Sequence, residues 1–428
     1  MVCGDPFSTH NGTGLTMTNL FRGWPPEGIA QVYTSLIPPS MGVCSRYWRL
    51  DLSDLGVPAW TRRLLKRLAS PHGRNEIAVA ANGKADLAMA PTMPWLSGWA
   101  RRQLNNLSEL FAYQLSPAFQ DWIQGVNPQV IYSPLASVRI MGVACTLSEM
   151  AQVRIVPHFM DDWPATLYRS SAFAPVLRAR LAAALQRVLK RSSIGLTIGD
   201  AMAREYTRRF GLAFEPFMNC VEEQRLATCS PQSTPRRAVE FVYTGGLHLK
   251  RWQSLREIGA ALLRLRGRGV VGELRIYTGS DEAKCYGRAL TLEPAMRVAG
   301  SLPADQVAEV QRSADCLVHV ESFNQRHRRF TRYSISTKIP EYLGSGRPLL
   351  AYGPGEVASL QYIQESGAGV VVGEHDTAQL SAALEKLIRG ADLRLALGRA
   401  GHRVACQRHR SLDQRERLRV LLATQANE

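Results

Sequence analysis

The second half of the chain alternates short apolar runs with stretches of helical periodicity, and this alternation constrains the fold most. Strands are expected at residues 240–244, 273–278, 296–299, 316–320, 349–352 and 369–372, and helices at 252–265, 305–313, 357–365 and 377–387. Strands that alternate with helices of this length are joined by right-handed crossovers into a parallel sheet that is covered on both faces. The sequence therefore predicts a Rossmann-like α/β domain here.

The first half carries a similar but weaker pattern. A short apolar start at residues 1–3 leads into a glycine-containing loop and then a helical stretch at 15–21, which is the entry to a Rossmann-like unit. Either the first strand is short or residues that precede it are missing. Because 428 residues exceed one ordinary core, we predict two domains. Their predicted bounds are 1–228 and 239–405, with a linker at 229–238 and a final helical segment at 406–428.

Residues 321–348, between two predicted strands, hold the clearest binding pattern. Ser336 or Thr337 can cap a short helix there. The unpaired N–H groups and the positive dipole at a helix start attract an anion, and Lys338 adds a full charge. Glu341 falls near the same face and can bind both hydroxyls of a ribose. These features predict a nucleotide-diphosphate site, against the plainer alternative of a capped surface helix with a Lys–Glu pair.

Residues 336–351 read Ser-Thr-Lys-Ile-Pro-Glu-Tyr-Leu-Gly-Ser-Gly-Arg-Pro-Leu-Leu-Ala. This run resembles the Lys-x-x-Glu-Tyr-x-x-x-Gly-x-Pro segment of the family four glycosyltransferases, which are retaining enzymes with the GT-B fold. The resemblance extends in order over residues 240–389 and is patchy before them. It implies two Rossmann-like parallel-sheet domains that face a cleft, with the C-terminal helix, 406–428, crossing back to the first domain.

The segment after the first strand of the second domain resembles the part of the family that grips the donor diphosphate. Gly245 and Gly246 are followed by Lys250 and Arg251, and cations at the carboxyl end of a strand suit phosphate binding. The family often has Arg directly after the first glycine. Since Gly246 stands there in this chain, Lys250 or Arg251 is expected to carry more of the charge.

Two more loops are assigned to the donor by the same resemblance. Gly300 and Leu302 belong to a loop that commonly cradles the nucleotide base, largely through its main chain. Gly12, Thr13 and Gly14 correspond to a loop on the floor of the cleft, between acceptor and donor. Glycines let a ligand approach the backbone closely, although an ordinary tight turn has the same pattern.

Polar side chains follow the expected strand at residues 153–156. His158, Asp161 and Asp162 come at its carboxyl end, where ligands bind in open α/β sheets. The resemblance implies that His158 and Asp161 lie beside the donor sugar and the acceptor hydroxyl, with Glu321 as a further sugar ligand. The plainer alternative is a hydrogen-bonded histidine and a turn.

Glu321 stands farther from Glu341 than the corresponding pair in the family, because residues 324–333 are inserted between them. The insert carries four arginines. It is either a basic lid that orders on a phosphorylated ligand or a solvated loop.

Retaining transfer in this family is thought to need no covalent enzyme intermediate. Protein groups neutralise the departing diphosphate and hold the reactants in register. The basic residues named above suit the first task, and His158, Asp161 and Glu321 suit the second. No metal ligands and no cofactor are expected, apart from the nucleotide sugar that serves as donor.

Charge and cysteine usage point to a location and a partner. The chain has 52 Lys and Arg against 36 Asp and Glu, a net charge of +16, and a pI near 9.8. Such a surface favours phosphorylated substrates, an anionic membrane or nucleic acid. Eight scattered cysteines without a Cys-x-x-Cys pair, no signal peptide and no membrane-spanning apolar run predict a cytoplasmic protein.

We therefore expect a cytoplasmic glycosyltransferase with peripheral contact with the inner face of the cell membrane. Its expected acceptor is a glycan or a polyprenyl-linked glycan, as in bacterial surface polysaccharide assembly. The alternatives are a nucleotide-sugar epimerase on the same fold and a non-catalytic basic scaffold that binds anionic lipid or nucleic acid. Since no nucleic-acid-binding motif is present, a nucleic-acid partner is not expected.

Two apolar and basic segments of the first domain stay ambiguous. Residues 61–68 form either a solvated helix or a membrane-surface helix. The segment around Trp95 and Trp99 is either core packing or a platform for a lipid acceptor.

Overall fold

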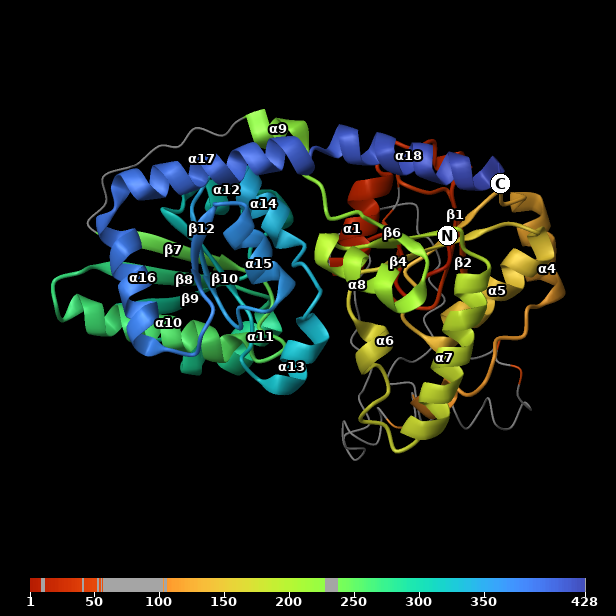
Figure 1. Cartoon of the computed structure of the whole chain (residues 1–428), viewed down its shortest axis with the longest axis horizontal. Coiled ribbons are helices and arrows are strands. Elements are labelled where there is room, and N and C mark those ends of the chain that lie inside the picture. Colours follow the sequence, from red (N-terminus) through yellow and green to blue (C-terminus); the bar gives the residue numbers. More distant parts are fainter. Residues whose placement is uncertain are drawn as a thin grey trace.

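The computed structural model describes residues 1–8, 12–40, 42–51, 54, 56, 103, 106–227 and 238–427. The expected helix at 61–68, the segment around Trp95 and Trp99 and residues 229–237 of the expected linker lie outside this part. The described residues form two α/β domains side by side, each built on parallel strands (Figure 1). The predicted fold class is thereby confirmed.

The N-terminal domain contains parallel strands whose bounds are β1 (Ala30–Tyr33), β2 (Arg46–Arg49), β3 (Ile131–Ser133), β4 (Ile155–Phe159), β5 (Ile194–Thr197) and β6 (Ala213–Pro216). β1 pairs with β2, and β3 to β6 form a second group in chain order. Val2 connects the two groups, because it forms a parallel bridge with Val32 and donates its N–H to the Tyr132 carbonyl at 3.0 Å. The predicted first strand is thus reduced to one residue, Val2, which lies between β1 and β3.

The C-terminal domain holds six parallel strands, and each lies within one residue of its predicted bounds. They are β7 (Val239–Thr244), β8 (Gly272–Tyr277), β9 (Met296–Gly300), β10 (Cys316–Val320), β11 (Leu349–Tyr352) and β12 (Gly369–Val372). Their order is β12-β11-β10-β7-β8-β9. The chain reverses direction across the sheet between β7 and β10, and ligands of such sheets bind outside the carboxyl ends of the strands at this switch point.

Helices cover both sheets. In the N-terminal domain these are α1 (Gly12–Phe21), α4 (Pro117–Val126), α5 (Val138–Ala151), α6 (Trp163–Thr166), α7 (Ala174–Lys190), α8 (Asp200–Phe210) and α9 (Glu223–Ala227). In the C-terminal domain they are α10 (Arg251–Arg266), α11 (Ser280–Tyr286), α12 (Ala304–Ser313), α13 (Gln325–Thr331), α14 (Lys338–Gly344), α15 (Ala358–Glu365), α16 (Thr377–Arg389) and α17 (Ala391–Arg408).

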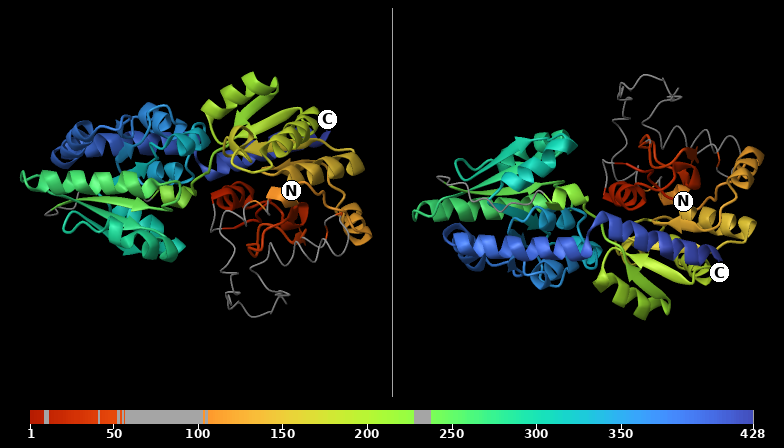
Figure 2. Two further views of the ribbon diagram at one scale, coloured as in Figure 1. Left: turned by 90° about the horizontal axis from the view of Figure 1, so that it is seen from below. Right: turned by 90° about the horizontal axis from the view of Figure 1, so that it is seen from above.

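The C-terminal segment differs in detail from its prediction. The final helical segment was predicted at 406–428, but α17 extends to Arg408 and α18 (Ser411–Asn427) begins after a break. At the break, Val221 donates its N–H to the His409 carbonyl at 2.7 Å and accepts the N–H of Ser411 at 3.0 Å. α17 lies along the C-terminal domain and α18 along the N-terminal domain, so together they run across both (Figures 1 and 2).

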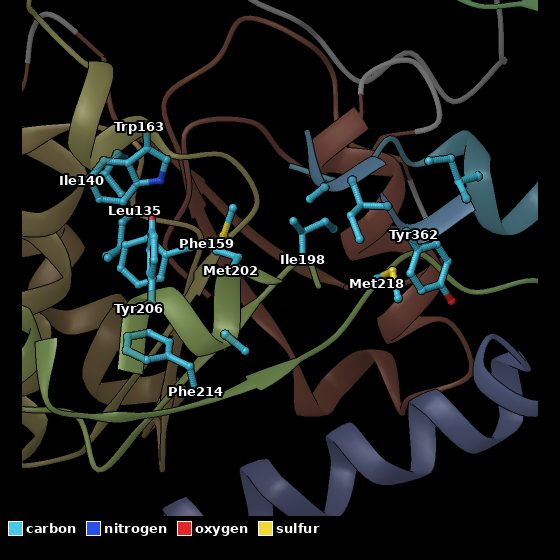
Figure 3. Close-up of a cluster of buried hydrophobic side chains, with 14 of the residues drawn as sticks. Leu135, Ile140, Phe159, Trp163, Ile198, Met202, Tyr206, Phe214, Met218 and Tyr362 are labelled. Atoms are coloured by element: carbon cyan, nitrogen blue, oxygen red, sulfur yellow. The ribbon is translucent and has the colours of Figure 1, made fainter. Parts of the chain in front are cut away.

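One apolar cluster is shared by the two domains. Ile198 and Met218 of the N-terminal domain lie in the same cluster as Tyr362 of the C-terminal domain (Figure 3). Ile335 of the C-terminal domain also belongs to this cluster. The domains are therefore packed against each other through buried side chains as well as joined by the chain. No helix within the described ranges is both long and apolar enough to cross a membrane.

Candidate active site

Lys338 extends from the start of α14 towards the carboxyl end of β7. Its Nζ lies 4.4 Å from the centroid of the Tyr243 ring and 3.4 Å from the Tyr243 hydroxyl. Gly245 makes room for it, since a Cβ at that position would overlap the ammonium, and its φ of +146° also favours glycine. Lys338 is thus brought together with the glycine loop that was predicted to grip a diphosphate.

The pKa of Lys338 is lowered to about 7, mainly by burial and then by the Arg251 charge, while nearby carboxylates oppose the shift. No carboxylate of the described residues forms an ion pair with Lys338. The cation is therefore held close to the point at which it loses its proton, and an anionic ligand would favour its charged form.

Glu321 follows β10 directly and is 2 % exposed. Its Oε1 accepts a hydrogen bond from Arg251 Nη2 at 2.9 Å and lies 3.5 Å from Nε2 of His319. Oε2 has no hydrogen-bond partner among the described side chains and main chain. The Arg251 charge is thus balanced within the protein, whereas Glu321 keeps one buried acceptor oxygen for a ligand.

Glu341 lies on α14 with Lys338. Its Oε1 is 3.6 Å from Arg225 Nη1. Burial raises its pKa, and the Arg225 and Lys338 charges and the Gln311 side chain act against this rise. Gln311 also donates to the Thr244 hydroxyl at 3.1 Å, which connects α12, α14 and β7. The sequence reasoning did not include Gln311, although its place on a helix after the base-cradling loop is a usable signal.

The predicted cap of α14 is wrong in one respect. Neither Ser336 nor Thr337 accepts a hydrogen bond at its side chain from the first turn of the helix. Instead, the Ser336 carbonyl accepts the N–H of Ile339 at 3.0 Å, and the Thr337 carbonyl accepts from Asn219 Nδ2 at 2.8 Å. The helix start is therefore fixed through its backbone by a residue of the other domain.

The remaining predicted donor residues lie where β7 and β9 end and in the loops that follow. Lys250 is exposed, with φ +60°, at the residue before α10, and Gly246 lies against the His248 ring. Gly300 ends β9 with φ +98° and accepts the Thr278 N–H at 3.0 Å. Leu302 follows it and is half-buried.

Glu282, in the first turn of α11, is a residue that the sequence analysis missed. It accepts the Leu247 N–H at 2.9 Å and the Thr278 hydroxyl at 2.7 Å. Its carboxylate therefore orders the glycine loop. The signal was an acidic residue opening a helix directly after a strand, which is a common pattern and a weak one.

The first turn of α1 contains Gly12, Thr13 and Gly14. A Cβ on Gly12 would lie 3.7 Å from the Thr337 methyl group, so the start of α1 faces the start of α14 across the two domains. The predicted cleft-floor loop thus lies next to the predicted donor helix.

Asp161 and His158 are placed differently. Burial raises the pKa of Asp161, whereas the Ser334 side chain and the Arg251 charge, both of the C-terminal domain, act to lower it. His158 is fully buried in β4, with Nδ1 2.5 Å from the Tyr132 hydroxyl. Burial lowers the pKa of His158 to about 4 despite backbone hydrogen bonds. Asp161 therefore joins the cluster, whereas His158 binds Tyr132 within its own sheet.

Asp162 has a structural role. Its Oδ1 accepts from Arg209 Nη1 at 2.8 Å and from the Tyr206 hydroxyl at 2.9 Å, which ties the start of α6 to α8. Across the described ranges, no group of three or more His, Cys, Asp and Glu side chains is arranged to hold a metal ion.

Solved structures resemble this chain over its whole length. Alr3699/HepE of Anabaena in complex with UDP is 11% identical, with a TM-score of 0.62 and coverage of 99% of both chains. Sucrose-phosphate synthase from Thermosynechococcus elongatus is 13% identical, with a TM-score of 0.61, covering 99% of this chain and 96% of that one. WaaG, a glycosyltransferase involved in lipopolysaccharide biosynthesis, is 13% identical, with a TM-score of 0.56, covering 99% and 98%.

The chain has the GT-B fold. Its two parallel-sheet domains, and the helices α17 and α18 that run across both, agree with the architecture expected from the sequence. No protein-family model and no curated protein sequence matches it.

Proposed function

We propose that the protein is a retaining glycosyltransferase of the family four type, which moves a sugar from a nucleotide-diphosphate sugar to a glycan or lipid-linked acceptor. The observation that carries the proposal is the set of groups at the switch point. There Lys338 and Glu341 share one helix, and Glu321, with its unbonded oxygen, lies within electrostatic reach of Lys338. The neighbour that was crystallised with UDP supports a nucleotide donor.

The roles follow from charge and position. Lys338, with Lys250 at the rim, neutralises the departing diphosphate, and Glu341 binds the ribose hydroxyls. Glu321 Oε2 accepts a hydrogen bond from a sugar hydroxyl, and Asp161 holds the acceptor from the other domain.

In the proposed step the acceptor oxygen bonds to the anomeric carbon while the bond from that carbon to the diphosphate breaks. The acceptor proton passes to the diphosphate. This scheme uses protein cations alone, so we propose a metal-independent reaction.

A membrane-bound acceptor suits the surface of the N-terminal domain. Phe173 and Val176, at the start of α7, are 37 % and 52 % exposed, and Arg169 and Arg180 are exposed beside them in sequence. Apolar side chains flanked by arginines suit an anionic lipid surface. We therefore propose a peripheral enzyme at the inner face of the cell membrane that acts in surface polysaccharide assembly.

Thermal stabilisation by UDP-, GDP-, dTDP- and CMP-sugars tests the donor site. A ligand that binds only the folded protein raises the unfolding midpoint, so one nucleotide should stand out. Glu341→Gln keeps the volume but cannot grip two hydroxyls as a carboxylate, and it should lose most of the shift. Glu356→Gln, at a half-exposed carboxylate paired with Arg328, is the matched control and should respond like the wild type.

The outcomes separate the candidate functions. If no nucleotide sugar raises the midpoint, or if Glu341→Gln responds like the wild type, the donor assignment fails and a basic scaffold gains support. An epimerase would change the configuration of the donor sugar in the absence of any acceptor, whereas the proposed enzyme would release nucleotide only slowly by transfer to water.

A further inference from the structure

The connection from α13 to α14, residues 333–337, lies against the N-terminal domain along most of its length. The Tyr333 ring is 5.3 Å from the Arg209 guanidinium carbon. Ser334 lies beside Asp161, and Ile335 packs so closely on Gly199 that a Cβ there would overlap it. These contacts end at Thr337, directly before Lys338.

Asn219 makes a buried polar contact with this connection. It lies between β6 and α9, is 1 % exposed, and both ends of its amide are bonded. Nδ2 donates to the Thr337 carbonyl at 2.8 Å, and Oδ1 accepts from Asn19 Nδ2 at 2.8 Å. A buried amide with both ends paired has one favoured orientation, because reversing it would leave both partners unsatisfied.

Asn19 is itself held in place. It belongs to α1, and its carbonyl accepts Arg415 Nε of α18 at 2.8 Å. A continuous chain of hydrogen bonds therefore runs from α18 through α1 and Asn219 to the backbone that carries Lys338.

We propose that Asn219 is a positioning residue that fixes the start of α14 against α1, and so sets the donor diphosphate at one spacing from the acceptor-side domain. The inference rests on the proposed function for its catalytic consequence. Binding of the nucleotide itself needs groups of the C-terminal domain, whereas transfer needs both domains in register, and a displacement of about 1 Å can cost roughly a hundredfold in rate.

Asn219→Asp tests the proposal. Aspartate keeps the side-chain shape and still accepts from Asn19, but it cannot donate to the Thr337 carbonyl. The measured rate is the release of nucleotide from the nucleotide sugar that stabilises the wild type most. In the variant this rate should fall about ten- to a hundredfold. The dissociation constant of the corresponding nucleoside diphosphate, with UDP and GDP as the probes, should change by less than about threefold. A residue with only a structural role would lower the unfolding midpoint and leave the rate of the folded protein unchanged.

Asn324→Asp is the matched control. Asn324 caps α13 by accepting the Arg326 N–H at 3.2 Å, and aspartate caps equally well, so rate and affinity should not change. Asn219→Ser, which carries no charge, should show the same split between rate and affinity if the aspartate variant does not fold.

Amide hydrogen exchange of residues 338–344, measured without any ligand, tests the positioning role independently of the proposed function. It should accelerate at least about tenfold in the Asn219 variants and stay unchanged in Asn324→Asp. The positioning role would be overturned if residues 338–344 exchanged at the wild-type rate in both Asn219 variants. It would also be overturned if nucleotide affinity fell together with the rate of nucleotide release. If no nucleotide binds to the wild-type protein, the proposed function is overturned instead.

Discussion

The side chain of Lys338 is surrounded by an aromatic ring, a glycine loop and the Arg251–Glu321 pair. Each of these surroundings has a separate effect. The Tyr243 ring stabilises a cation, burial and the Arg251 charge destabilise it, and Gly245 provides the space. The proton on Lys338 is therefore the property of the site that ligand binding should change most.

This balance predicts a pH dependence of nucleotide binding. With a pKa of about 7 in the free protein, Lys338 is largely neutral above that pH, and a bound diphosphate would raise its pKa. Binding then takes up a proton, so affinity should be highest below pH 7 and fall by up to about tenfold per unit from pH 7 to 9.

Calorimetric titration of the nucleoside diphosphate in buffers of different ionisation enthalpy measures this proton uptake. Lys338→Arg keeps a cation that does not titrate in this range, and its affinity should be independent of pH. If the affinity of the wild type were also independent of pH, Lys338 would not contact the diphosphate.

Gly245→Ala should disturb the same lysine by a steric route. The φ of +146° disfavours any side chain, and the added methyl group would occupy the position of the ammonium. Unfolding free energy should fall by about 1–3 kcal/mol, and nucleotide affinity should fall with it. Urea denaturation gives the first quantity, with Gly279→Ala as control, because Gly279 has φ −58° and no atom within 4 Å. Equal losses in the two variants would contradict the steric argument.

At the scale of elements, the sequence predicted best those strands and helices whose bounds depend on the local residue pattern. The strands of the C-terminal sheet were predicted within one residue, because each is a short run of mostly apolar or alternating apolar and polar residues that ends at a loop. The inserted segment, left open between a lid and a solvated loop, forms α13 with Asn324 as its cap. The break between α17 and α18 was missed because its cause, the backbone of Val221, is distant in sequence.

The candidate site shows the same limit. Lys338, Glu341 and Glu321 could be found, because each stands in a short motif beside a strand. Asn219 could not be assigned a role, since its partners are 200 and 118 positions away. His158 was expected to follow a strand at 153–156, but β4 runs to Phe159, so His158 lies inside the strand whereas Asp161 lies beyond its end. Strand ends are poorly defined by sequence alone.

At the scale of the molecule, α18 and the shared apolar cluster join the two domains. Leu418 and Leu422 of α18 are buried in the cluster that contains Met17 and Leu20 of α1. α18 continues the C-terminal chain, yet its apolar face completes the core of the N-terminal domain. We therefore expect the two domains to unfold together.

Leu418→Ala tests this coupling. Leu418 is fully buried, so its truncation should cost about 2–5 kcal/mol, whereas Val420→Ala on the same helix, at a side chain that is 56 % exposed, should stay within about 0.5 kcal/mol. Scanning calorimetry should show one transition in the wild type, which Leu418→Ala moves to lower temperature without splitting, because Ile335 and Tyr362 keep the C-terminal domain dependent on its neighbour. Two separate transitions in the variant would show instead that α18 alone couples the domains and that the shared cluster is too weak to do so.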